Sequence, residues 1–320
     1  MKRLFGYKAR LRGLGSRHSL LPAACGLLLL LAAFLPAHAD TYSLIVSGLG
    51  GEPEYDQKFR EQATTLAEAA HTLTGDASKA VALVAQQADR NSVRRELRAL
   101  AAKAGPDDAV IVTLIGHGSF DGEEYRFNLP GPDLTATELG ALFDQLRANH
   151  QLIVNATSAS GAVIERWKSE RRIVITATKN GGERTATKFA TYWVQALAKP
   201  DADINKDEIV TVAEAFDFAS RRVAGEFESD KSLATEHARL EGPGADGFQV
   251  ARFGVAARVT ADPELNELFA QRVRLERDLD GVKQRRQALA EDAYYNELEG
   301  VLVRIASLQR QIDARQAVQP

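Results

Sequence analysis

From residue 41 onward, short apolar runs alternate with segments in which apolar residues recur every three or four positions. The run at residues 109–115 is a nearly unbroken stretch of β-branched and aliphatic residues, as in a strand buried on both faces. Such alternation of strands and helices predicts an α/β protein with a mostly parallel sheet. Other strands are expected at residues 42–46, 80–84, 152–155 and 172–177, a short hairpin strand at 124–128, and a last strand pair within 248–259.

Helices are expected between these strands. Asn91 is a predicted helix cap, and Thr135 with Glu138 has the spacing of a capping box. Residues 226–250 carry no clear pattern. The expected helices cover residues 55–73, 91–104, 135–148, a segment ending at 167, 185–198 and 211–223.

The segment after residue 262 is long, charged and helical in pattern. Its apolar residues keep a three-and-four spacing whose phase breaks between Leu289 and Leu298. This predicts a C-terminal α-helical hairpin with a coiled-coil seam, its second helix capped near Glu291 and Asp292. Because two helices bury only part of such a seam, we expect residues 263–316 to mediate self-association or to bind a partner helix.

The N-terminal residues have the order of a secretory signal. A basic segment ends at Arg17, an apolar run is densest at residues 26–35, and Ala37-His38-Ala39 supplies small residues before a cleavage point. We expect cleavage after Ala39. The alternative is an uncleaved anchor at residues 20–37, near the minimum length for a ~30 Å hydrocarbon layer. Both place the body outside the cytoplasm, periplasmic or secreted, because the basic residues stay inside.

The predicted domains are therefore a signal peptide (1–39), an α/β domain (40–260) and a helical hairpin (261–320). The chain has 320 residues and is 45% apolar, which excludes disorder as its main state. Six of the 40 basic residues lie in the first 39 positions, which hold no acid. The remainder has 34 basic and 43 acidic residues, a charge of −9, so nucleic acid is not expected as a partner.

Cysteine usage narrows the chemistry further. The single cysteine, Cys25, lies in the apolar N-terminal stretch, so the processed protein contains no thiol. Disulfides, cysteine-ligated zinc and a catalytic cysteine are excluded together. No organic cofactor is expected.

Two predicted strands end in side chains that can carry chemistry. The strand at 109–115 ends in Gly116-His117-Gly118-Ser119, and the strand at 152–155 runs into Thr157, Ser158 and Ser160. Ligands of parallel sheets collect at the carboxyl ends of strands. The N–H of Gly118 can point at a developing oxyanion, so His117, Gly118 and Ser158 are the candidate site.

This arrangement resembles the caspase-like fold of cysteine peptidases and, within it, the legumain family. The resemblance covers about residues 42–225 and implies a three-layer, mostly parallel sheet. In that family a histidine is the general base, the glycine after it donates to the oxyanion, and a cysteine two residues before a Ser-Gly pair is the nucleophile. The resemblance implies His117 as base, Gly118 as oxyanion donor and Ser158 at the nucleophile position, before Ser160-Gly161.

Ser158 stands where the family has cysteine. A thiol with a pKa of ~8.5 needs little activation, whereas a hydroxyl normally needs a base oriented by a carboxylate. We therefore expect a degenerate or serine-variant peptidase that binds a peptide or protein in its cleft. The alternative is an active serine-dependent acyl hydrolase, esterase or peptidase, using Ser158 and His117. A hydrogen bond between Ser158 Oγ and the His117 ring would favour the enzyme.

An acidic segment at residues 203–214 follows the EF-hand spacing. Glu208 takes the sixth position, where glycine favours the sharp turn, so a weak Ca²⁺ site is expected, with a plain acidic helix–helix connection as the alternative. His237, in the unassigned segment, is a further candidate site residue, the alternative being a solvated loop. The metal ligands predicted at loop positions 1, 3, 5, 9 and 12 are Asp203, Asn205, Asp207, Thr211 and Glu214.

Overall fold

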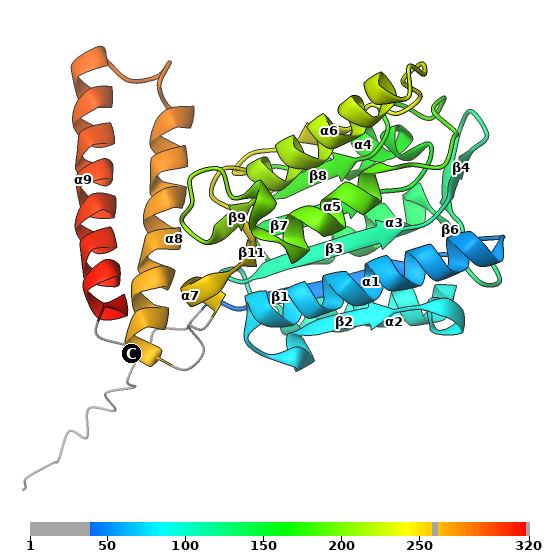
Figure 1. Cartoon of the computed structure of the whole chain (residues 1–320), viewed down its shortest axis with the longest axis horizontal. Coiled ribbons are helices and arrows are strands. Elements are labelled where there is room, and N and C mark those ends of the chain that lie inside the picture. Colours follow the sequence, from blue (N-terminus) through cyan, green and yellow to red (C-terminus); the bar gives the residue numbers. More distant parts are fainter. Residues whose placement is uncertain (1–38, 258–261, 318–320) are drawn as a thin grey trace, which may run out of the picture. The chain divides into compact units, whose positions relative to one another are not determined.

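A six-stranded sheet forms the centre of the computed structural model, which describes residues 39–257 and 262–317 (Figure 1). Its strand order is β10-β8-β7-β3-β1-β2, and all neighbours are parallel except β10, which is antiparallel to β8. The predicted α/β class with a mostly parallel sheet is confirmed. The strands are β1 (Thr41–Ser47), β2 (Ala80–Leu83), β3 (Ala109–Ile115), β7 (His150–Asn155), β8 (Arg172–Thr176) and β10 (Arg239–Glu241).

Several predictions fall on residues outside this description. They are the signal peptide up to residue 38, with Cys25, and the alternative anchor at residues 20–37. The predicted boundary between residues 260 and 261 also lies outside the described residues, at 258–261. The described residues belong to one compact unit, His38–Pro320. Within them, no helix combines the length and apolarity needed to cross a membrane.

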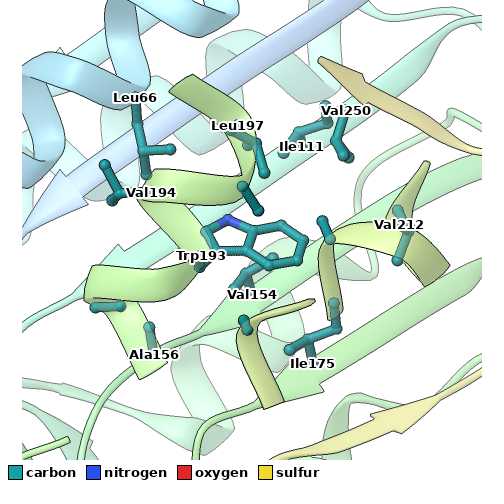
Figure 2. Close-up of a cluster of buried hydrophobic side chains, with 14 of the residues drawn as sticks. Leu66, Ile111, Val154, Ala156, Ile175, Trp193, Val194, Leu197, Val212 and Val250 are labelled. Atoms are coloured by element: carbon teal, nitrogen blue, oxygen red, sulfur yellow. The ribbon is translucent and has the colours of Figure 1, made fainter. Parts of the chain in front are cut away.

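Alternate side chains of the strands enter two separate cores. On one face, Ile111 and Val154 pack with Leu66 and Trp193. Figure 2 shows the Trp193 ring within this cluster of buried side chains, and only 1% of this residue is exposed. The helices on this face are α1 (Pro53–Thr74), α5 (Phe189–Ala198) and α6 (Val212–Ser229).

The other face of the sheet has its own core. Val112 and Ile153, which neighbour Ile111 and Val154 in sequence, pack here with Leu97 and Trp167. Burial on both faces explains why β3 reads as an unbroken apolar run. The helices on this face are α2 (Arg90–Lys103), α3 (Ala136–Phe143) and α4 (Ile164–Trp167).

Two small sheets complete the strands. The strand predicted at 124–128 is confirmed as β5 (Tyr125–Phe127), which lies between β4 (Gly118–Phe120) and β6 (Leu134–Thr135). The strand pair predicted within 248–259 is wrong. β11 (Gln249–Arg252) pairs instead with β9 (Ile209–Thr211), and α7 (Gly254–Ala257) follows it. The short 3₁₀ helices are η1 (Ala77–Lys79), η2 (Ala85–Gln87), η3 (Ser160–Val163) and η4 (Pro200–Ala202).

Helix ends follow capping chemistry, with one correction. Asn91 is not the cap of α2, because the Asp89 carboxylate accepts the backbone N–H groups of Asn91 and Ser92 at 2.8 and 2.9 Å. The predicted capping box of Thr135 and Glu138 is confirmed. Their helix, α3, ends at residue 143 rather than 148, and α6 continues to 229, beyond the predicted 223.

The C-terminal segment contains two helices, α8 (Pro263–Gln284) and α9 (Glu291–Gln316), which contact each other along their lengths. Four of their apolar residues, Leu265, Phe269, Leu308 and Ile312, form one buried cluster with Ile209 of β9 and Ala256 of α7. Part of the apolar seam predicted for this segment is therefore buried against the same chain.

Candidate strand-end site and acidic loop

The residues predicted at the two strand ends lie together. β3 and β7 are adjacent parallel strands, with Leu114 beside Asn155, so His117, Gly118 and Ser158 emerge at the same edge of the sheet. The N–H of Gly118 donates a hydrogen bond to Ser158 Oγ at 3.3 Å. Ser158 is only 2% exposed. The serine hydroxyl is therefore held at the backbone donor that was predicted to serve an oxyanion.

Gly118 is required at this contact. A Cβ atom there would lie 2.5 Å from the Tyr125 ring, 2.6 Å from the Ser158 carbonyl oxygen and 2.7 Å from Thr157 Oγ1. All three distances are shorter than any real Cβ contact, and two of the three neighbours are buried polar atoms. Only glycine lets the ends of β3 and β7 approach so closely.

The His117 ring packs among aromatic side chains of α1. Its centroid is 4.9 Å from that of Tyr55 and 5.1 Å from that of Phe59, both in edge-to-face geometry. Such contacts fix the plane of the ring. The ring is thus oriented by α1 on one face of the sheet.

The electrostatic surroundings of His117 favour its neutral form. Burial lowers its pKa and outweighs a hydrogen bond with the Gly50 backbone and the charges of Asp56 and Glu52, which raise it. Among the hydrogen bonds of residues 39–257 and 262–317, none joins the His117 ring to Ser158 Oγ. The base and the hydroxyl predicted to act together share an edge of the sheet without forming a catalytic hydrogen bond.

Hydrogen bonds hold the segment after β7 around Ser158. The Tyr125 hydroxyl and Thr157 Oγ1 are 2.6 Å apart, and Thr157 Oγ1 donates to Asn155 Oδ1 at 2.8 Å. Burial raises the pKa of Tyr125 far above its ordinary value, so its hydroxyl stays protonated. Ala159 has a left-handed backbone (φ 55°), a conformation that costs a residue with a Cβ of order 1 kcal/mol.

Ser160 has a structural position. It is fully buried, and its Oγ accepts the N–H of Thr178 at 3.1 Å. Thr178 Oγ1 in turn accepts the N–H of Gly161 at 2.8 Å. These bonds tie the segment after β7 to the segment after β8.

His237 is paired with Glu183, which no pattern in the sequence indicates as a site residue. His237 Nδ1 lies 2.5 Å from Glu183 Oε1, and the Glu183 carbonyl accepts the N–H of Ala159 at 2.7 Å. The backbone of Glu183 therefore lies next to the Ser158 peptide. Burial raises the pKa of Glu183, but hydrogen bonds from the Lys179 N–H and from His237 outweigh it and lower the pKa overall. No spacing in the sequence links residues 183 and 237. They meet because β10, which follows His237, pairs with β8, which precedes Glu183.

Glu236, next to His237, caps α5. Its carboxylate oxygens accept the N–H groups of Lys188 and Phe189 at 2.7 and 2.8 Å. Only 5% of this residue is exposed. Burial raises its pKa to about 7, against the effect of the two N–H donors.

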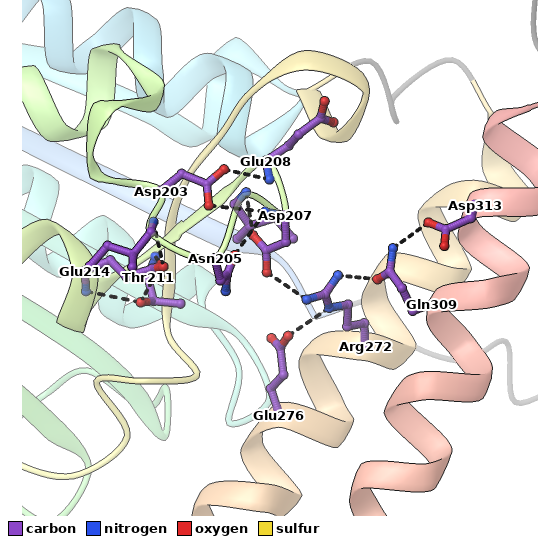
Figure 3. Close-up of polar contacts among 12 residues, drawn as sticks. Asp203, Asn205, Asp207, Glu208, Thr211, Glu214, Arg272, Glu276, Gln309 and Asp313 are labelled. Carbon is purple, nitrogen blue, oxygen red and sulfur yellow. Dashed lines mark hydrogen bonds and ion pairs between the residues drawn. The ribbon is translucent and has the colours of Figure 1, made fainter.

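The acidic loop is closed by its own hydrogen bonds, which Figure 3 displays. Asp203 accepts the backbone N–H groups of Asp207 and Glu208 at 3.2 and 2.9 Å, and Asn205 Oδ1 accepts the Asp207 N–H at 3.0 Å. Glu208 has a left-handed backbone (φ 66°), as expected at the sixth loop position, although it is not glycine. The five predicted metal ligands thus lie on one tight loop.

Two of those ligands serve another purpose. Thr211 and Glu214 form the capping box that starts α6: Thr211 Oγ1 accepts the N–H of Glu214, and Glu214 Oε2 accepts the N–H of Thr211. Glu214 Oε1 accepts the N–H of Ile204 at 3.3 Å. The carboxylate oxygens of Glu214 are engaged with backbone donors.

A buried arginine of α8 lies against the loop. Arg272 is 9% exposed and bonds Asp207 Oδ2 at 2.7 Å and Glu276 Oε1 at 2.9 Å (Figure 3). Burial raises the pKa of Asp207 more than Arg272 lowers it. In the part of the chain that the structure describes, no group of three or more His, Cys, Asp or Glu side chains is arranged to hold a metal ion. Calcium binding by this loop stays a prediction.

Comparison with known proteins assigns no family to the chain. No family model matches it, and no curated protein does. Among solved structures, it is similar to the crystal structure of protein GSU0716 from Geobacter sulfurreducens, with 13% identity and a TM-score of 0.45, over 67% of this chain and 97% of that one. At this level of likeness, function has to be argued from the side chains of the site.

We expect the buried carboxyl group of Glu236 to make the stability of the folded protein depend on pH. Its carboxyl titrates near 4.5 when unfolded and at about 7 when folded, so the folded state binds more protons between these values. The free energy of unfolding should fall as pH rises from about 4.5 to about 7, by up to roughly 1.4 kcal/mol per pH unit. Denaturant unfolding at several pH values measures this. Glu236→Gln should flatten the slope, whereas Glu228→Gln, on the exposed face of α6, should keep it; equal slopes would contradict the assignment.

We expect calcium to bind the acidic loop in competition with Arg272, which bonds Asp207. Because a ligand of the folded state stabilises it by mass action, millimolar calcium should raise the melting temperature of the protein. Asp203→Asn should abolish the shift, Asp217→Asn outside the loop should keep it, and Arg272→Gln should enlarge it by freeing Asp207. Each variant is compared with itself in chelator. Melting curves that calcium leaves unchanged in both the natural protein and Arg272→Gln would exclude the site.

Proposed function

We propose that this protein is an exported caspase-like or legumain-like protein that binds a peptide or protein at the carboxyl edge of its sheet and hydrolyses it slowly or not at all. One observation carries the proposal. The Gly118 N–H, the donor that the resemblance assigns to the oxyanion, donates to Ser158 Oγ, while the His117 ring lies against Tyr55 and Phe59.

Hydrolysis needs a different arrangement of the same groups. An oxyanion donor must point at the developing negative oxygen, and a general base must reach the nucleophile within about 2.6–3.2 Å. Here the donor is bonded to the nucleophile itself, and burial lowers the pKa of His117. Ser158 also lacks the intrinsic acidity of a thiol. These features favour binding over turnover.

The neighbouring β4 supports a peptide as the ligand. β4 begins at Gly118, and in the described part of the chain it pairs with β5 alone, so its other side is a sheet edge. An extended peptide can add to such an edge through backbone hydrogen bonds. A peptide on β4 would pass beside Ser158, where the family cleaves its substrates.

A second candidate function is acyl hydrolysis by Ser158, and the Glu183–His237 pair favours it. An imidazole held by a carboxylate through one ring nitrogen is the arrangement that activates serine nucleophiles. Glu183 supplies that carboxylate to the His237 ring. The backbone carbonyl oxygen of Glu183 accepts the N–H of Ala159, the residue after Ser158. His237 would act in place of His117.

Nucleophile replacement distinguishes the two functions. In the binding protein, a peptidyl acyloxymethyl ketone should label Ser158→Cys, because a thiol needs little activation, and should not label the natural protein. Labelling should disappear in the Ser158→Cys, His117→Ala double variant. Ser119→Cys, an exposed thiol on β4, controls for adventitious reaction.

Hydrolysis assays decide the alternative. If the natural protein cleaves peptides or esters, and the rate falls by orders of magnitude in both Ser158→Ala and His237→Ala, it is the acyl hydrolase. If Ser158→Cys is not labelled and the natural protein has no hydrolytic activity, the strand-end site is not a peptide cleft and the proposal fails.

We further propose that α8 and α9 form a coiled-coil hairpin that associates with a second copy of the chain. Tyr295, Leu302 and Val303 of α9 are 50%, 46% and 58% exposed. Replacing Leu302 and Val303 by lysine should therefore reduce the assembly size measured by light scattering. Leu233→Lys, at an 86% exposed position outside these helices, should leave it unchanged. A natural protein that is monomeric at micromolar concentration would refute self-association.

A further inference from the structure

We propose that Asp108 binds the α-amino group created by cleavage after Ala39, so that processing adds an ion pair at the start of β1. This inference rests on the proposed export. It makes residue 40 the first residue of the processed chain and Asp108 the receptor of its ammonium group.

The position of the Asp40 nitrogen carries the inference. It donates to Asp108 Oδ1 at 2.8 Å, and the carbonyl oxygen of Asp40 accepts the Ala109 N–H at 2.8 Å. Residue 40 is therefore already held against β3 by both of its backbone groups, one residue before β1 begins. Ala39, on the other side of the cleavage point, is exposed.

The Asp108 carboxylate is fixed for this contact. Its second oxygen, Oδ2, accepts the N–H of Gly105 at 2.8 Å, which leaves Oδ1 facing residue 40. Cleavage changes the donor from a neutral amide into an ammonium group without moving it. The backbone N–H already donates to a charged acceptor, and the positive charge of an ammonium adds a direct Coulombic attraction to the same carboxylate.

The space around residue 40 can hold a charged amine. A cavity of about 390 Å³ opens beside it, with Ala39, Asp40, Asp76, Lys79 and Arg252 among its lining residues. The two donors of the ammonium that do not reach Asp108 can therefore be hydrated. The negative character of the region also affects Tyr42. The pKa of this residue is raised to about 12, mainly by burial and then by the charges of Asp40, Asp108 and Asp76.

Charges of both signs face this position, so the effect of Asp108 has to be isolated. Lys79 Nζ bonds Asp40 Oδ1 at 2.6 Å, and the Tyr42 hydroxyl donates to Asp40 Oδ2 at 3.1 Å. An adjacent carboxylate raises the pKa of an amine by favouring its charged form. The acids around the site are Asp40, Asp76 and Asp108, and the cations are Lys79 from η1, Lys103 from α2 and Arg252 from β11.

The sign of the pH dependence follows from the pair. An α-amino group ordinarily titrates at about 7.7–8.0, and pairing with Asp108 makes the folded value higher. The stabilisation is then complete below the unfolded value and is lost as pH rises through the folded one. Only a chain whose residue 40 has a free α-amino group has this stabilisation.

The experiment titrates the amine directly. Residues 40–320, which lie within the compact unit, are prepared with Asp40 as the first residue, and the ¹³C-methylated α-amine is followed by NMR. We expect a proton dissociation constant roughly tenfold smaller than that of the same chain extended by Ala39. Asp108→Asn should remove the difference, while Asp107→Asn, its exposed neighbour, should retain it. Equal titration of the natural sequence and Asp108→Asn would overturn the proposal.

A second measurement keeps the test open if Asp108→Asn does not fold. The chain with a free Asp40 amine should melt at a higher temperature than its α-acetylated form at pH 7, and the difference should vanish at pH 10. Equal melting at pH 7 would overturn the proposal. The mass of the exported protein tests cleavage separately: a first residue other than Asp40 refutes the processing step and leaves the peptide-binding proposal untouched.

Discussion

Burial of the parallel strands on both faces is the constraint on which the rest of this structure depends. Helices cover both faces of the four strands β1, β3, β7 and β8. Most of the side chains of these strands are therefore buried in two apolar cores. Most side chains between the strand ends are apolar, so the polar groups that could meet a ligand lie where the strands begin and end. The candidate strand-end site lies at the carboxyl edge, and the site proposed for a processed amine lies at the amino edge.

At the carboxyl edge, the contact between Gly118 and Ser158 decides what chemistry is possible. The absent Cβ at Gly118 lets two strand ends touch, and this contact places a backbone N–H on the serine hydroxyl. With a thiol in place of the hydroxyl, the same proximity would still permit a reactive nucleophile, because a thiolate forms with little help. With serine, the Gly118 N–H is bonded to the hydroxyl, and the contact supplies no base. Whether the atom at this position of residue 158 is oxygen or sulfur therefore decides how much activation the side chain would need to react.

The parts of the fold that sequence could predict are those fixed by local pattern. β3 lies at the predicted residues, and the Thr135–Glu138 capping box is present, since both depend on neighbouring residues. The pairing of β11 with β9 could not be predicted, because it joins short strands about forty residues apart. The cap of α2 at Asp89 was missed in favour of the equally plausible Asn91, two residues on.

For the site, the sequence predicted the edge of the sheet at which the residues lie, but not the orientations of their side chains. His117 and Ser158 had to emerge together once β3 and β7 were parallel neighbours, yet the packing of the imidazole on Tyr55 and Phe59 depends on α1, sixty residues earlier in the chain. The partnership of Glu183 with His237 spans 54 residues, and that of Asp207 with Arg272 spans 65. No spacing rule covers such distances, because tertiary contacts alone create them.

The acidic loop illustrates how one pattern can encode two structures. A Thr and a Glu three residues apart occupy positions 9 and 12 of an EF-hand loop, and the same spacing defines a capping box. Here Thr211 and Glu214 start α6 as a capping box, and Asp207 receives the Arg272 guanidinium. An arginine is a cation that the chain itself provides, so it can neutralise the loop without coordinating it. For calcium to bind, it must supply more free energy than the hydrogen bonds and the ion pair that it would displace.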